Sequence, residues 1–137
     1  MISVSVDYMD APLAKELEPL VKAHTKETCG EDLFEKMNWP MYFFLQEMGA
    51  FLIVVAREGA DVVGYNAYTI SESMHDITKV QARQDSIFIT PEHRNKSVVA
   101  KLIKKAESAM KSAGVNHIFY SKPSGRSGIE LTKVKEI

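Results

Sequence analysis

The sequence has little cysteine and no long apolar run, and both absences exclude whole classes of protein. Cys29 is the only cysteine among 137 residues, so no internal disulfide and no cysteine-rich zinc site can form, which fits a reducing, cytoplasmic setting. The longest apolar run, residues 49–56, is far below the roughly 18–20 residues that cross a bilayer. The first ten residues show no basic stretch followed by an apolar one, so we expect no secretory signal. These features predict a single cytoplasmic domain, residues 1–137, with no membrane partner.

An excess of charge of one sign is also missing, because the formal net charge is −1. No overall field favours nucleic acid, and the lysine-rich helix expected at 98–113 lacks the interleaved aromatic side chains of a nucleic-acid surface. The histidines stand at 24, 75, 93 and 117, without the close spacing of a metal site. We therefore expect no nucleic-acid partner and no metal. The charges are nevertheless uneven, with acidic residues gathered in the first quarter of the chain and basic residues between 94 and 111.

Alternating and β-branched apolar residues predict six strands, separated by turns and polar connections. The expected strand ranges are 2–8, 50–58, 62–71, 81–89, 115–121 and 129–137, with connections at 72–80 and 122–128. A first helix should begin at Asp10 as its N-cap, be kinked or split by Pro19, and give way to a loop at 25–33. Residues 34–49 should form helical pieces interrupted at Pro40, and residues 98–113 an amphipathic helix. This order of elements favours an α+β fold.

The stretch ITPEHRNKSVVAKLIKKAESAMKSAG, residues 89–114, places a basic turn between a strand and a helix. A helix N-terminus presents unpaired N–H groups and about half a positive charge, which together suit a phosphate. Turns that cradle a phosphate usually carry glycine, yet none lies between Pro91 and Gly114. The stretch is therefore either a phosphate-binding turn that works without glycine, a damaged one, or a simple connection.

Two stretches together resemble the GCN5-related N-acetyltransferase (GNAT) superfamily. The stretch REGADVVGY, which contains Gly64, is similar to the entry into the family's third strand. The stretch IFITPEHRNKSVVAKLI keeps apolar, proline and basic residues in places that match the family's strand and turn, namely Ile87, Ile89, Pro91 and Arg94. The resemblance implies a mixed, mostly antiparallel sheet with helices on both faces, shortened here at the C-terminus.

The resemblance also implies acetyl-CoA as the acetyl donor. In the family, the turn amides bind the coenzyme A pyrophosphate, and the strand before the turn pairs with the pantetheine arm. These cofactor-binding roles would fall here on Ile87, Phe88, Ile89, Arg94, Asn95, Lys96, Ser97, Val98 and Val99. Two of these residues replace the family's glycines. Ser97 still offers its amide, whereas the branched Val99 stands where the backbone must approach the ligand closely, so the pyrophosphate loop is degenerate.

The acid-base pair that the resemblance implies is matched less closely. If the strand is unbulged, one of its faces holds Arg83, Asp85, Ile87 and Ile89. Family members often place a glutamate on this face, and Asp85 is the nearest carboxylate, so Asp85 is the candidate general base. The helix that often carries the family's general-acid tyrosine is absent or reduced to a turn, which leaves Tyr120 as the candidate acid. A group of aromatic residues is interpreted as core or interface rather than as a substrate site: Trp39, Phe43 and Phe44.

Two functions follow from the resemblance and stay open. The first is an acetyl-CoA-dependent N-acetyltransferase that acts on an amine of a small molecule or a protein. The second is an inactive acetyltransferase fold that serves as a binding or assembly protein with a protein partner. This second reading resembles acetyltransferase-like proteins of tailed phages, which would place the chain in a host cytoplasm. A homodimer formed through the C-terminal strand is a further alternative.

Overall fold

The computed structural model describes residues 1–123 and 129–137 and arranges the strands in one six-stranded sheet. The strands lie side by side in sequence order, and every neighbouring pair is antiparallel except β4 and β5. Their bounds are β1 Ile2–Asp7, β2 Phe51–Glu58, β3 Asp61–Glu72, β4 Val80–Ile89, β5 His117–Pro123 and β6 Ile129–Glu136. The predicted connection at 122–128 is therefore partly β5, and its residues 124–128 lie outside the described residues.

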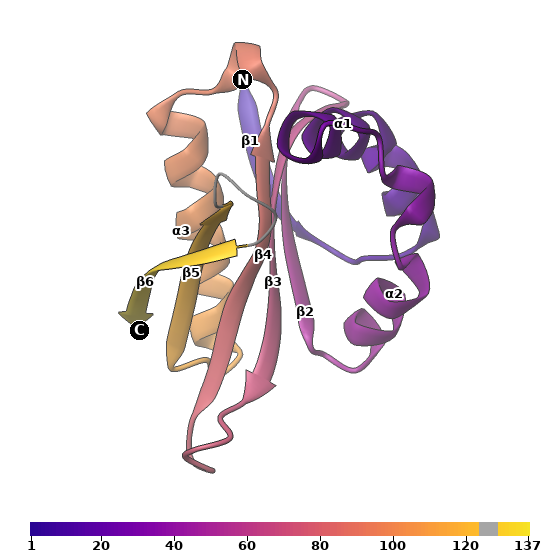
Figure 1. Cartoon of the computed structure of the whole chain (residues 1–137). Coiled ribbons are helices and arrows are strands. Elements are labelled where there is room, and N and C mark those ends of the chain that lie inside the picture. Colours follow the sequence, from indigo (N-terminus) through magenta and orange to yellow (C-terminus); the bar gives the residue numbers. More distant parts are fainter. Residues whose placement is uncertain (124–128) are drawn as a thin grey trace.

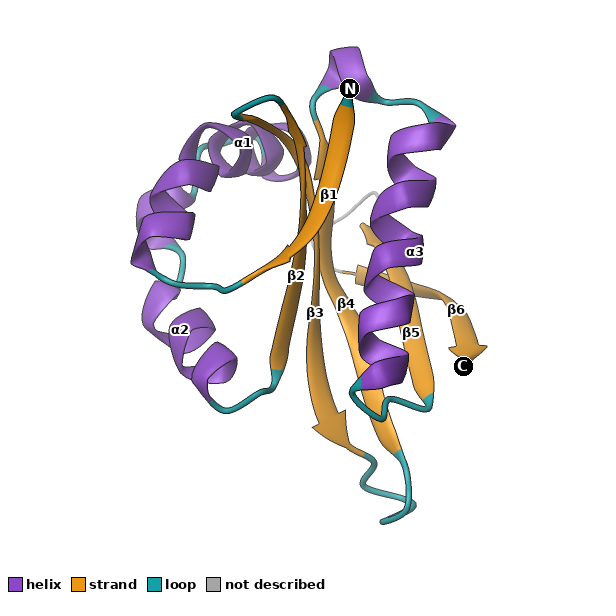
Figure 2. Ribbon diagram, turned by 180° about the vertical axis from the view of Figure 1, so that it is seen from behind, coloured by secondary structure: helices purple, strands orange, loops and turns teal. Residues whose placement is uncertain are grey.

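The helices cover both faces of this sheet. Figure 1 shows α1 (Ala11–Cys29) and α2 (Trp39–Glu47) on one face and α3 (Lys96–Ser112) on the other, and Figure 2 shows the same layers from behind. Short 3-10 turns precede α2 and α3, at Phe34–Lys36 and Pro91–His93. A separate hydrophobic core fills the space on each side of the sheet. The predicted α+β class, with a mostly antiparallel sheet between helices, is confirmed.

The two internal prolines do not interrupt the helices as the sequence suggested. α1 begins as expected, because Asp10 Oδ1 accepts a hydrogen bond from the backbone N–H of Leu13 at 3.0 Å. It then continues through Pro19 and through most of the expected loop at 25–33, and ends at Gly30 with φ 81°. Its buried stripe packs on the sheet, and this packing outweighs the hydrogen bond that the proline removes. Pro40 lies in the first turn of α2, where proline is tolerated.

β4 is the strand that shapes the space around it. It pairs with β5 only over 81–83 with 117–119, although β4 runs on to residue 89 and β5 to residue 123. The start of this pairing is fixed by Asn116, whose backbone N–H donates to Val80 O and whose Oδ1 accepts from Val80 N, both at 2.8 Å. Beyond Arg83, the described part of β4 has no partner strand on the β5 side.

No helix in the described ranges is long and apolar enough to cross a membrane.

β4 also contains a β-bulge, which changes the expected faces of the strand. Ala67 of β3 stands opposite Ser86 and Tyr68 stands opposite Gln84, so Asp85 is an extra residue between them. Asp85 and Ile89 were expected to share a face only in an unbulged strand, and because β4 is bulged they do not share one. Ile89 packs into the core beneath α3, whereas Asp85 points to the other side of the sheet, toward α1 and α2.

Candidate active site

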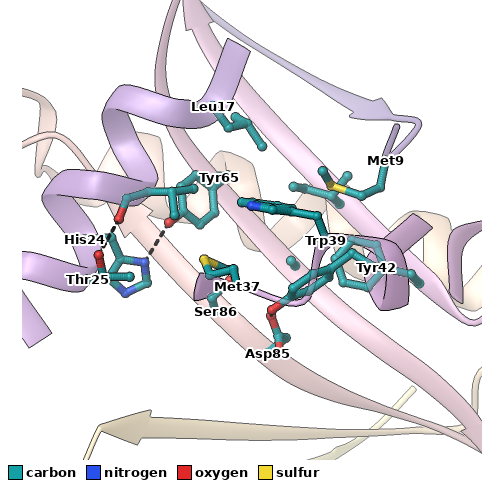
Figure 3. A pocket seen from close by; sticks show the side chains of 14 residues that line it. Met9, Leu17, His24, Thr25, Met37, Trp39, Tyr42, Tyr65, Asp85 and Ser86 are labelled. Carbon is teal, nitrogen blue, oxygen red and sulfur yellow. Dashed lines mark hydrogen bonds between the residues drawn. The ribbon is translucent and has the colours of Figure 1, made fainter. Parts of the chain in front are cut away.

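A cavity of about 150 Å³ lies between the sheet and the two N-terminal helices. Figure 3 shows its lining, which comes from α1, α2, the segments before these two helices, and strands β2, β3 and β4. The apolar part of the wall consists of Met9, Leu17, Val21, Met37, Trp39, Phe51, Ile53 and Ala67. The polar part consists of His24, Thr25, Tyr42, Tyr65, Asp85 and Ser86. Asp85 is thus the one carboxylate among the residues that line the cavity.

Asp85 is held in the cavity by the bulge and by a tyrosine. The bulge brings Asp85 and Ser86 into the wall together, and the Tyr42 hydroxyl donates a hydrogen bond to Asp85 Oδ2 at 3.0 Å. Burial raises the pKa of the Asp85 carboxyl, while the hydrogen bonds from Tyr42 and Ser86 act in the opposite direction and only partly offset burial. A half-buried carboxylate with a raised pKa accepts a proton more readily than an exposed aspartate does, which suits a general base.

A second polar pair closes another part of the cavity wall. His24 Nδ1 and the Tyr65 hydroxyl are 2.7 Å apart, and the His24 ring stacks on Phe88 with 5.0 Å between centroids. Burial lowers the pKa of His24, an effect that Arg94 adds to and Glu27 opposes. Burial also raises the pKa of Tyr65, so that both side chains are neutral at pH 7. The pair is therefore a neutral hydrogen-bonding element beside the single carboxylate.

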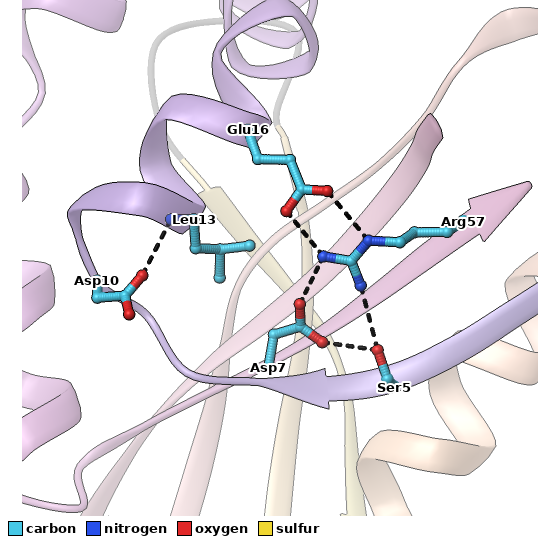
Figure 4. A network of polar contacts seen from close by, with 6 residues as sticks. All are labelled: Ser5, Asp7, Asp10, Leu13, Glu16 and Arg57. Atoms are coloured by element: carbon cyan, nitrogen blue, oxygen red, sulfur yellow. Dashed lines mark hydrogen bonds and ion pairs between the residues drawn. The ribbon is translucent and has the colours of Figure 1, made fainter. Parts of the chain in front are cut away.

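The position of α1 over the sheet is fixed by one arginine (Figure 4). Arg57 of β2 binds Asp7 Oδ2 of β1 at 2.7 Å and Glu16 Oε1 of α1 at 2.9 Å, and a further guanidinium nitrogen donates to Ser5 Oγ at 3.3 Å. The side chain of Arg57 is 21% exposed, so the charges are shielded in part from solvent. The network joins β1 and β2 to the second turn of α1, and so holds in place the helix that covers the cavity.

In the turn before α3, side chains expected to bind a phosphate are hydrogen-bonded to other groups of the chain. Asn95 Oδ1 caps the helix by accepting from Val98 N at 3.1 Å. Arg94 is drawn toward α1 and β4: its Nη2 is 2.7 Å from Glu27 Oε2, its Nε donates to Ile89 O at 2.7 Å, and its guanidinium lies 5.3 Å from the Phe88 ring centroid. Arg94 therefore already has partners within the chain.

The missing glycines cause no backbone strain in this turn. No described residue other than glycine has a positive φ, so the turn needs no residue with glycine's freedom. Val98 is buried, and Val99 is half-buried and packs against the core beneath α3, while Ser97 is exposed. The branched side chain of Val99 is thus accommodated by the core, which weakens the steric objection raised from the sequence. The side chain of Lys96 lies outside the described residues.

The remaining predicted site residues divide between the two faces of the sheet. Phe88 packs in the core beneath α1, Ile89 in the core beneath α3, and Ile87 is half-buried. Tyr120 also lies beneath α3, where its hydroxyl donates to Glu107 and its ring meets Tyr68 edge-on at 6.1 Å between centroids. The structure therefore does not bring the two candidate catalytic residues together, since Asp85 opens to the opposite face.

Several cavity residues were not singled out from the sequence as site residues. Trp39, interpreted as core or interface, lines the cavity, while its Nε1 donates to Phe34 O at 3.0 Å. Phe43 packs beside the core under α1, and Phe44 is exposed, so both fit the interpretation of these aromatic residues as core or interface. Tyr42 is not part of any recognisable sequence motif. Its role depends on a hydrogen bond to Asp85, 43 positions away, and a local sequence pattern cannot predict a contact at that separation.

Comparisons with known proteins identify the fold. A comparison with curated protein sequences finds no match. Among solved structures, the aminoglycoside acetyltransferase HMB0005 from an uncultured soil metagenomic sample is similar with a TM-score of 0.71 and 16% identity, over 91% of this chain and 82% of that chain. A ribosomal-protein-alanine N-acetyltransferase from Brucella melitensis biovar Abortus 2308 gives a TM-score of 0.67 and 14% identity, with the same coverage.

A third structure carries the acetyl donor. It is a predicted acetyltransferase with acetyl-CoA from Clostridium acetobutylicum, similar with a TM-score of 0.73 and 10% identity over 90% of this chain and 82% of that chain. At these identities, the likenesses show the shared fold and not a shared substrate. The model of the Acetyltransferase (GNAT) family matches residues 15–127, which is most of the 137 residues. The chain belongs to the acetyltransferase (GNAT) family.

Proposed function

We propose that this protein transfers the acetyl group of acetyl-CoA to a primary amine that binds in the cavity, with Asp85 as the general base. One observation carries the proposal. The segment of β4 that leaves β5 after Arg83 is the same segment whose bulge directs Asp85 into the cavity. A base in the acceptor pocket and, among the described residues, a strand edge without a partner strand for the donor therefore lie within a few residues of each other.

The residues present fit acetyl-CoA on two counts. Beyond Arg83, the described part of β4 has no partner strand on the β5 side, and this strand edge suits pairing with the amides of the pantetheine arm. The first turn of α3 adds the N–H groups and positive end of a 17-residue helix for the pyrophosphate, on a turn free of positive φ. When bound, acetyl-CoA supplies the acetyl group as a thioester open to attack by an amine.

Side chains of the cavity wall then accept the proton that the amine loses and orient the group that accepts it. As the amine nitrogen bonds to the thioester carbon and the carbon–sulfur bond breaks, Asp85 takes the proton that the nitrogen loses. Tyr42 fixes the orientation of the carboxylate through its hydrogen bond to Oδ2. The departing thiolate takes up a proton from solvent. The neutral His24–Tyr65 pair adds hydrogen-bonding groups to the wall without adding charge.

The test combines binding and turnover. Acetyl-CoA at a hundredfold excess over its dissociation constant should stabilise the fold by about 2.7 kcal/mol in a thermal scan. Thiol release in the presence of a panel of primary amines should fall about 10²–10⁴-fold in Asp85→Asn, with donor binding kept. Phe44→Ala, on the exposed side of α2, serves as the matched control. The absence of both a thermal shift and thiol release would refute the proposal.

The alternative is an inactive fold that binds a protein partner or takes part in assembly, and a different observation favours the loss of donor binding that this alternative requires. Arg94 is bound by Glu27 and Ile89, and Asn95 caps Val98, so groups that a pyrophosphate needs are already engaged. The exposed face of α2, together with the residue that follows it, also carries an apolar row for a partner: Met41, Phe44 and Met48. A partner retained by Arg94→Glu but lost with Phe44→Ala, together with no thiol release, favours this function.

A further inference from the structure

We infer that the acceptor is a small monoamine with a compact, ring-sized apolar body, such as an arylalkylamine, and is neither a polycationic sugar nor a lysine side chain of a protein. The inference rests on the proposed function, because it takes the cavity beside Asp85 as the acceptor site. It adds the substrate class, which the fold does not determine. Three features of the cavity carry it: its charge, its walls and its size.

The cavity wall has one carboxylate, which suits a ligand with a single ammonium group. Asp85 is the single carboxylate among the cavity residues, and a polycation would need several. In the protein without acetyl-CoA, the acidic side chains of α1 do not supply them, because each is paired with a cation of this chain. Arg57 binds Glu16 at 2.9 Å, Lys22 is 2.8 Å from Glu18, and Arg94 is 2.7 Å from Glu27. A ligand with one positive charge is therefore neutralised here, and a ligand with several is not.

The walls and the size match an apolar body with one ring. Trp39 lies against Tyr42 with 5.6 Å between centroids, and Tyr42 meets Phe51 edge-on at 5.3 Å, so aromatic faces and edges surround the space near Asp85. Aromatic rings favour an apolar ring and an ammonium group, whereas burying sugar hydroxyls against them leaves those hydroxyls without partners. The cavity volume of about 150 Å³ is of the order that admits a benzene-sized ring.

The position of Trp39 gives a direct assay that needs no acetyl donor. Trp39 is the one tryptophan of the sequence and lines the cavity, so its fluorescence reports on a ligand bound there. Titration with 2-phenylethylamine should give a saturable change. The matched probe 2-phenylethanol, which lacks the ammonium group, and the variant Asp85→Asn should each weaken binding about tenfold or more. Phe44→Ala should bind as the unmodified chain does, and circular dichroism checks that each variant is folded.

The competing acceptors are tested in the same way and in turnover. The aminoglycoside neamine and a lysine-containing peptide should saturate Trp39 fluorescence at least tenfold more weakly than 2-phenylethylamine, and should be acetylated more slowly. Tighter binding or faster acetylation of either would overturn the inference while leaving acetyl transfer intact. Equal binding of 2-phenylethylamine and 2-phenylethanol would also overturn it. Saturable amine binding with no thiol release under any condition would instead overturn the proposed function and leave the ligand class standing.

Discussion

At Asp85, one residue of β4 lies outside the ladder with β3, and this local geometry decides which side chains reach the cavity. In a regular strand, Asp85 would share a face with Ile89, which instead packs beneath α3. The bulge sets Asp85 and Ser86 side by side in the wall and keeps Phe88 on that face. Bulges often aim a side chain at an active site in this way.

The stability of the Asp85→Asn variant tests the burial of this carboxyl. Burial raises the pKa of Asp85 in the folded chain above its value in the unfolded chain, so the folded chain holds the proton more tightly. The free energy of unfolding therefore falls as pH rises from the ordinary aspartate range through the raised pKa. Asp85→Asn should lose this fall and be at least as stable as the unmodified chain at pH 7. Denaturant titrations at several pH values measure it, and a marked loss of stability would contradict it.

The hydrogen bond from Tyr42 gives a prediction for the pH dependence of activity. This bond lowers the pKa of Asp85 against the effect of burial, so Tyr42→Phe should raise that pKa further. The acid limb of kcat/KM, where Asp85 becomes protonated, should then move to higher pH. Burial keeps Tyr65 protonated and lowers the pKa of His24, so neither neighbour should produce the shift. Tyr8→Phe, at an exposed tyrosine, is the control, and an unmoved limb would count against Asp85 as base.

At the scale of elements, the sequence predicted the strands and α3 well because their apolar patterns are local. It misplaced the end of α1, because a loop around Gly30 was expected over 25–33, whereas the packing of the buried stripe through Leu20 and Val21 keeps the helix intact beyond Pro19. The separation of β4 from β5 followed only from the family resemblance, in which the strand before the turn pairs with the pantetheine arm, and whether β4 is bulged at Asp85 was left open. Both depend on which backbone lies alongside β4, and a single strand's sequence does not contain that information.

The contact between β3 and β4 predicts the effect of a single methyl group at Gly64. A Cβ added there would lie 3.0 Å from Phe88 O and 3.1 Å from Ile89 Cγ1, and the backbone oxygen cannot move alone. Gly64→Ala should therefore destabilise the fold by about 1–3 kcal/mol and weaken acetyl-CoA binding, because it displaces the end of β4. Ser71→Ala, at an exposed position of the same strand, should change neither. Thermal scans with and without acetyl-CoA measure both effects, and an unchanged melting temperature would refute the tight contact.

The arginine that joins β1, β2 and α1 gives the second prediction at this scale. Arg57→Met keeps much of the side-chain volume but leaves Asp7 and Glu16 without their shared partner. We expect a loss of about 1–2 kcal/mol in the free energy of unfolding, since charged hydrogen bonds in a partly shielded site are broken. Lys22→Met removes an exposed pair with Glu18 on the same helix and should have little effect. Urea titrations of both variants decide it, and equal stabilities would show that the network holds nothing in place.

The two faces of the sheet hold different candidate residues. The core under α3 contains Tyr120, whereas the cavity with Asp85 lies under α1 and α2. The sequence supported the family and the fold but not this division, because the cavity wall is assembled from segments that begin at Met9 and end at Ser86. Residues that lie this far apart in the chain become neighbours only through the complete sheet and its register.

The ion pair of Arg94 with Glu27 links these two faces, because it ties the turn at the start of α3 to the end of α1. If the turn binds the pyrophosphate, Arg94 must exchange Glu27 for a phosphate, and the pair competes with the ligand. Glu27→Gln should then strengthen acetyl-CoA binding by up to about fivefold, the limited range expected of an exposed pair, whereas Arg94→Gln should weaken it. Isothermal titration at low and moderate salt measures both, and the gain in Glu27→Gln should shrink as salt screens the pair. Lys36→Gln, which removes another exposed ion pair, with Glu31, is the control. If acetyl-CoA binds equally to all three variants, Arg94 has a structural role only, and backbone amides alone bind the pyrophosphate.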